Sequence, residues 1–150
     1  MTAIGEVVER EEFIVQWKIK NFFSLSSKTD TFYSSPLFSF ANETWYIRIY
    51  PNGSKQDKSN GYIDLYLCRS SSGLPIRLEY SLSVETMGEK IFRDIEVFGN
   101  RRFASGCSQF LNKIKLLETK LSDTLSVVCK MKNVKPDEVS SKSFYAIHVY

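Results

Sequence analysis

The chain has 150 residues with 20 basic and 17 acidic side chains, which gives a formal charge of +3 and the size of one domain. Hydrophobic residues make up 43% and aromatic residues 14% of it, and this apolar content excludes a disordered chain. Acidic and basic residues are interleaved, so the charge gives no field strong enough to favour nucleic acid or an anionic membrane as a partner.

Apolar and polar residues alternate through most of the chain, and this period of two predicts β-strands. Turn-forming residues separate the alternating runs, which is typical of an all-β sandwich or barrel. The residues expected to point inward are Phe13, Val15, Trp17 and Ile19, then Phe38 and Phe40, then Trp45, Ile47 and Ile49, then Ile63, Leu65 and Leu67, then Ile76, Leu78, Tyr80, Leu82 and Val84, and finally Leu125, Val127, Cys129 and Met131.

One segment departs from this alternation. Cys107, Phe110, Leu111 and Ile114 stand at positions i, i+3, i+4 and i+7, which predicts a short amphipathic helix over about residues 105–115. Ser105 is the expected N-cap of this helix. A helix N-terminus favours a thiolate, so Cys107 would be the most reactive of the three cysteines; packing of Cys107 beneath the helix is the alternative.

The cysteines and the single histidine provide no pattern for a metal site or for catalysis. Cys68, Cys107 and Cys129 are odd in number and widely spaced, so we expect free thiols in a reducing compartment rather than a disulfide framework. A nucleophilic triad would need His148, near the C-terminal end of the sequence. No apolar stretch approaches the roughly 18 residues of a spanning helix. We expect an intracellular, nuclear or cytoplasmic protein that is not an enzyme and has no cofactor, metal, nucleic-acid or membrane partner.

Tyrosines alternate with the apolar residues of the run from Tyr62 to Cys68. If Ile63, Leu65 and Leu67 point inward, the pleat of the strand places Tyr62, Tyr66 and Cys68 on its outer face. Asp64 shares this face with Tyr66, and solvated strand positions often carry an acidic residue, so we expect Asp64 to be solvated. Several aromatic residues on neighbouring strands would form a shallow peptide-binding surface, and ordinary surface residues are the alternative.

Five segments, in the same order, resemble the conserved blocks of the MATH (meprin and TRAF homology) domain. The segments are FIVQWKIKNF at 13–22, WYIRIYPNG at 45–53, GYIDLYL at 61–67, SGCSQF at 105–110 and LSDTLSVVC at 121–129. The resemblance covers residues 13–131. It leaves 1–12 as an N-terminal extension and 132–150 as a C-terminal linker or extra strand, with Phe144 to Tyr150 strand-like.

The resemblance is greatest to the speckle-type POZ (TD/POZ) branch, in which the MATH domain binds a Ser/Thr-rich peptide of a substrate and a following BTB/POZ domain binds a cullin scaffold for ubiquitin transfer. It implies an antiparallel β-sandwich of about seven or eight strands. The peptide-binding positions that it implies are Tyr66, Leu78, Phe98, Ser105, Gly106 and Cys107. Tyr66 matches a groove tyrosine, and Leu78 stands where that branch has a groove phenylalanine. A further groove tyrosine falls near Val97 or Phe98, of which Phe98 is preferred. Ser105 and Cys107 stand in place of the Trp and Phe of the Trp-Gly-Phe motif, and only Gly106 between them is kept.

Two functions follow from this resemblance. The first is a peptide-recognition module that binds protein or peptide substrates for a cullin-RING ubiquitin ligase, with a cullin partner only if a BTB domain follows residue 150. The second is a standalone or degenerate MATH scaffold, without a ligase link, whose partners bind another face. No coiled-coil heptads precede Phe13, so the domain itself is expected to be monomeric.

Overall fold

The protein is described from a computed structural model, which covers residues 12–25, 28–54, 61–85, 90–99, 103–119 and 122–134. These ranges form two antiparallel sheets. The four-stranded sheet has the order β1 (Phe13–Ile19), β9 (Leu125–Asn133), β6 (Ile76–Val84) and β7 (Ile91–Phe98). The five-stranded sheet has the order β2 (Tyr33–Ser34), β4 (Glu43–Tyr50), β5 (Tyr62–Arg69) and β8 (Ala104–Asn112), with β3 (Phe38–Phe40) also paired to β4.

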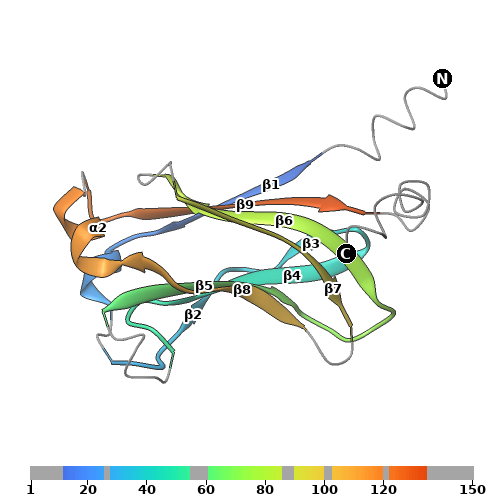
Figure 1. The fold of residues 1–150 in the computed structure, drawn as a ribbon, viewed down its shortest axis with the longest axis horizontal. Helices are drawn as coiled ribbons and strands as arrows, with labels where there is room; N and C mark the ends of the chain where they lie inside the picture. The colour runs from blue at the N-terminus through green and yellow to red at the C-terminus, as the bar shows by residue number, and fades with distance from the viewer. Residues whose placement is uncertain are drawn as a thin grey trace, which may run out of the picture.

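The two sheets lie one above the other, and a helix, α2 (Lys113–Thr119), lies at one end and leads from β8 in one layer to β9 in the other (Figure 1). A 3-10 turn, η1 (Phe22–Ser24), follows β1. This arrangement confirms the predicted all-β antiparallel sandwich, with nine strands in the described ranges rather than seven or eight. No helix in those ranges is long and apolar enough to cross a membrane.

The core lies between the sheets and is built mainly from residues that the alternation places inward. The fully buried ones are Ile47 and Ile49 of β4, Ile63, Leu65 and Leu67 of β5, Leu78, Leu82 and Val84 of β6, and Val127, Cys129 and Met131 of β9. The predicted inward residues Phe13, Val15, Phe38, Phe40 and Ile76 are only partly buried against this core. Trp45 is fully buried, donates its indole N–H to the Phe40 carbonyl oxygen at 2.9 Å, and packs edge-on against Phe98. Trp17 is half-buried and packs against this core.

The predicted helix over 105–115 is wrong, because Ala104–Asn112 forms strand β8 and the helix begins at Lys113. Leu65 is opposite Cys107 but Ile63 is opposite Leu111, so β8 has two more residues than β5 at this point. Gln109 lies in this bulge with a φ of 54°. A bulge changes which residues of a strand face inward, and here the change imitates helical spacing. The N-cap is Asn112, whose side-chain oxygen accepts from two backbone N–H groups of α2.

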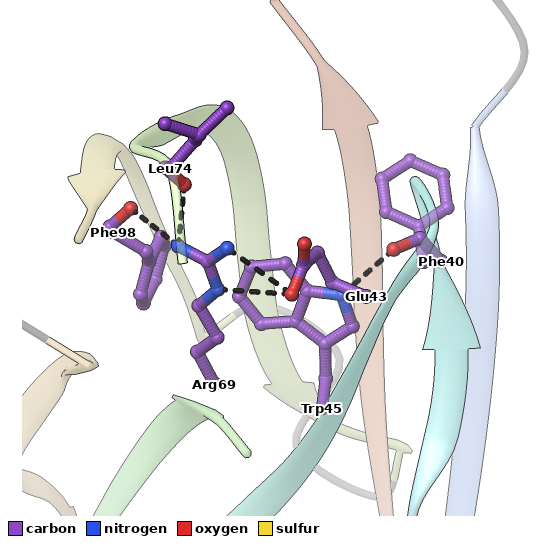
Figure 2. A network of polar contacts seen from close by, with 6 residues as sticks. All are labelled: Phe40, Glu43, Trp45, Arg69, Leu74 and Phe98. Carbon is purple, nitrogen blue, oxygen red and sulfur yellow. Dashed lines mark hydrogen bonds and ion pairs between the residues drawn. The ribbon is translucent and has the colours of Figure 1, made fainter. Parts of the chain in front are cut away.

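A buried arginine joins the two sheets near the end of β5 (Figure 2). Arg69 is 2% exposed and forms an ion pair with Glu43 of β4 at 3.1 Å. Its Nη1 donates to the carbonyl oxygens of Leu74 and Phe98, each at 2.9 Å. Because Phe98 ends β7 and Leu74 precedes β6, the guanidinium connects the five-stranded sheet to the four-stranded one. Arg69 has the same parity along β5 as the inward residues Leu65 and Leu67. This parity is the feature of the sequence that indicates a buried position for Arg69.

The predicted extensions fall mostly outside the described residues. Residues 1–11 of the N-terminal extension lie outside them, and so do residues 135–150, which include His148 and the strand-like run from Phe144. Strand β9 continues to Asn133, two residues past the predicted domain end, and the Val134 N–H donates to the Arg77 carbonyl oxygen.

Candidate functional site

The outer face of the five-stranded sheet carries a cluster of aromatic side chains around one arginine. Since Ile47 and Ile49 point into the core, Tyr46, Arg48 and Tyr50 of β4 point outward. Arg48 is opposite Tyr66 of β5 in the strand register, and Phe32, just before β2, is 46% exposed. We call Phe32, Tyr46, Arg48, Tyr50 and Tyr66 the aromatic surface.

The side chains of the aromatic surface contact one another. The Arg48 guanidinium carbon lies 4.2 Å from the centre of the Phe32 ring and 5.7 Å from that of Tyr46, which are cation–π distances. Arg48 also donates from Nη2 to the Tyr46 hydroxyl at 3.2 Å. The Tyr50 ring meets Tyr66 edge-on at 5.9 Å and Phe32 at 5.5 Å. These contacts hold the guanidinium against the sheet.

Arg48 is a cation without an acidic partner among the residues that the structure describes. The ion pair found there joins Arg69 to Glu43, and the Nε of Arg48 is buried without a hydrogen-bond partner. Burial acts to lower the pKa of Arg48, but its hydrogen bond with Tyr50 and the nearby Cys68 and tyrosine groups outweigh burial and raise the pKa. The aromatic surface therefore presents a positive charge that an anion could neutralise.

Asp64 lies beside the aromatic surface. The prediction that it is solvated is wrong, because the residue is fully buried. Its carboxylate accepts from the Gln109 backbone N–H at 2.8 Å, and from the Ser54 hydroxyl at 2.7 Å and the Ser54 backbone N–H at 3.2 Å. These bonds fix the β8 bulge and the turn after β4. Burial raises the pKa of Tyr66, and the negative charge of Asp64 raises it further. The phenol of Tyr66 therefore keeps its proton at neutral pH.

The six residues that the resemblance implied do not gather in one place. Tyr66 is partly exposed on the outer face, and Gly106 is its register partner on β8. Leu78 and Phe98 are fully buried in the core. Ser105 is also buried, and its hydroxyl shares a hydrogen bond with that of Tyr80.

Cys107 is half-buried opposite Leu65 and packs against the core. In this arrangement only Tyr66 and Gly106 of the six meet on the outer face, and peptide contact at these positions stays a prediction.

Gly106 allows β8 to approach β5 beneath the Tyr66 ring. A Cβ atom at Gly106 would lie 2.1 Å from the Leu65 carbonyl oxygen and 2.6 Å from the Tyr66 Cα. No real Cβ tolerates such distances, so the position requires glycine in this conformation. Gly106 therefore positions Tyr66.

The sequence predicted that Cys107 is reactive because it stands at a helix N-terminus. This reason is wrong, because Cys107 lies in strand β8. Burial raises its pKa, which the positive charge of Lys90 partly offsets. Cys68 has the outward parity expected for it but is fully buried, and burial raises its pKa too. Cys129 points into the core as expected.

Sequence reasoning identified Tyr66 and missed the rest of the aromatic surface. Tyr46, Arg48 and Tyr50 alternate with core isoleucines, so the signal for their outward direction was present. Phe32 lies outside regular structure in a segment without a period, and no local pattern predicts its place over Arg48.

Comparison with known families identifies the chain. The family model of the MATH domain matches residues 14–131, which are nearly the same residues as the predicted 13–131 and more than three quarters of the chain. A search of curated proteins finds no match. With the antiparallel sandwich, this match shows that the chain belongs to the MATH domain family, whose members are protein-interaction modules.

Proposed function

We propose that this MATH domain binds an extended peptide segment of a partner protein on the aromatic surface, with Arg48 and Tyr66 as its main contacts. The observation that carries the proposal is the Arg48 guanidinium, which lies among aromatic rings on the outer face of the five-stranded sheet and has no acidic partner among the described residues. Aromatic and arginine side chains are the residues that most often dominate binding energy at interfaces. The domain acts by binding, not by catalysis, and uses no cofactor.

The chemistry of the aromatic surface favours a peptide with one acidic residue flanked by apolar ones. A carboxylate would accept from the Arg48 guanidinium, whose planar donors suit it. The rings of Phe32, Tyr50 and Tyr66 would cover the neighbouring apolar side chains. The Ser/Thr-rich peptide of the speckle-type branch is a poor match, because Leu78, Phe98 and Ser105 lie in the core and supply no groove wall.

The proposal is tested by titrating the isotope-labelled domain with two peptides. One carries a single glutamate between apolar residues, and the other carries glutamine instead. We expect the first to bind and to shift the amide resonances of β4 and β5. Arg48→Gln and Tyr66→Ala should each weaken binding by about tenfold or more, while the free energy of unfolding changes by no more than about 1 kcal/mol.

The matched control is Tyr62→Ala, which removes a tyrosine of the same strand and parity outside the aromatic surface. Equal binding by the Arg48→Gln, Tyr66→Ala and unsubstituted domains would contradict the proposal.

We further propose that peptide binding serves to deliver substrates to a cullin-RING ubiquitin ligase. Support for this role is the resemblance to the speckle-type POZ branch, and the role needs a BTB domain in the same protein. Precipitation of the full-length protein from cells, followed by detection of cullins, tests it. Peptide binding without a cullin would favour the alternative, a MATH scaffold without a ligase link.

A further inference from the structure

The outer face of the four-stranded sheet carries a second group of unpaired cations. Across the strand register, Lys130 of β9 and Arg93 of β7 lie on either side of Ser81 of β6. Both cations are exposed, and neither makes an ion pair within the described part of the chain. Ile14 of β1 continues the row beside Lys130. This row contains no acidic residue.

Exposed isoleucines stand next to both cations. Ile91 and Ile95 are 43% and 54% exposed and have the same parity as Arg93 on β7, while Ile14 is 58% exposed beside Lys130. Apolar side chains of this size gain free energy when a partner covers them. The face therefore combines fixed positive charge with apolar area.

A shallow concavity of about 110 Å³ lies in this face, and Ser81, Ser83, Lys130 and Arg93 contribute to its lining. Two carboxylates, Glu12 and Glu79, and a third cation, Lys132, also line it, and Glu79 is the register neighbour of Lys132 and Ile95. A uniform polyanion such as a nucleic-acid strand would meet these carboxylates and would leave the isoleucines uncovered. The pattern suits separate carboxylates placed among apolar groups.

We propose that this cationic surface (Ile14, Ser81, Ile91, Arg93, Ile95 and Lys130) binds an acidic segment of a partner protein that presents carboxylates and apolar side chains on the same face. Lys130 and Arg93 are two strand spacings apart, about 10 Å, which two carboxylates of one extended segment can span. The surface lies on the sheet opposite the aromatic surface (Figure 1). It therefore goes beyond the proposed function and does not depend on it.

The test uses a blocked hexapeptide of sequence Glu-Glu-Leu-Leu-Glu-Glu, each face of which carries both glutamate and leucine when the peptide is extended, with the peptide that has glutamine in place of glutamate as its neutral counterpart. Titrated into the isotope-labelled domain, the acidic peptide is expected to shift the amide resonances around Ser81, Arg93 and Lys130. The double variant Arg93→Gln/Lys130→Gln should weaken its binding about fivefold to tenfold, the sum of two exposed charge pairs.

The matched control is Lys18→Gln/Lys115→Gln, which removes the same charge from exposed positions outside the concavity and is expected to leave binding unchanged. Equal binding of the neutral peptide, or equal binding by the Arg93→Gln/Lys130→Gln variant, would overturn the proposal. Stronger binding of a single-stranded oligonucleotide at this face would also overturn it. Shifts confined to Tyr66 and Arg48 would contradict this proposal while leaving the proposed function intact.

Discussion

At the scale of single residues, Arg69 has the greatest expected effect on stability. Arg69→Met keeps much of the side-chain volume but removes the donors to Glu43, Leu74 and Phe98. Removal of one partner from a buried charged network costs about 3–5 kcal/mol, and urea unfolding measures this loss. Arg77→Met, on the solvent side of β6, is the control and is expected to change the free energy of unfolding by less than about 0.5 kcal/mol. Similar losses in both variants would contradict the role of the network.

The three thiols are expected to react in the order of their exposure. Cys107 is half-buried, while Cys68 and Cys129 are fully buried, so alkylation of the native protein followed by mass spectrometry should label Cys107 first. Because burial raises its pKa, the labelling rate should keep rising as the pH increases past 9, where an ordinary thiol is already half-ionised. Faster labelling of Cys129 would contradict the inward direction of that side chain.

At the scale of elements, the pairing of β5 with β8 depends on Gly106. Gly106→Ala would place a Cβ atom against the backbone of Leu65 and Tyr66, so the strands must separate. We expect a loss of about 2–4 kcal/mol in the free energy of unfolding and weaker peptide binding through a displaced Tyr66.

Gly99→Ala provides the comparison, since its nearest neighbour would be Pro75 at 3.8 Å, an ordinary contact. A Gly106→Ala domain as stable as the Gly99→Ala domain would show that β8 can shift without cost.

Strand β8 also shows why the sequence alone did not predict every strand and helix correctly. The strands with an unbroken period of two, such as β4 and β6, were predicted with their inward residues. In β8 the bulge at Gln109 is held by Asp64, 45 residues away in the chain. No local pattern reports a contact made over that distance, so Ser105 to Leu111 appeared helical. The neighbouring helix α2 was predicted too early for the same reason.

At the scale of the whole molecule, the sequence predicted the sandwich but only part of the candidate site. Alternation identified most of the core residues on the strands, because burial between two sheets requires one apolar face on every strand. It did not identify Phe22, Phe110 or Leu116, which also lie in the core. The aromatic surface depends on which strands are neighbours and in which register, as Arg48 opposite Tyr66 illustrates. Strand register is set by the whole fold and cannot be read from a local motif. For this reason the resemblance implied groove positions for Leu78 and Phe98, whereas the structure places both side chains in the core.

The stability of the whole fold is expected to fall at alkaline pH through the buried thiol of Cys129. Burial raises its pKa from 9.0 to about 12, so the folded state keeps a proton that the unfolded chain releases. This contribution is fully present below about pH 9 and is lost as the pH rises toward 12, at about 1.4 kcal/mol per pH unit. Burial also raises the pKa of Tyr80, which adds to the loss above about pH 10.

Urea unfolding at several pH values between about 8 and 11 measures this dependence. Cys129→Ala should be less stable at neutral pH, because it leaves a small cavity, and should show a shallower decline above pH 9 because the titrating group is gone. Cys107→Ala is the matched control, since its thiol is only half-buried, and should keep nearly the full decline. The same decline in both variants would mean that other groups, with Tyr80 first among them, carry the alkaline instability.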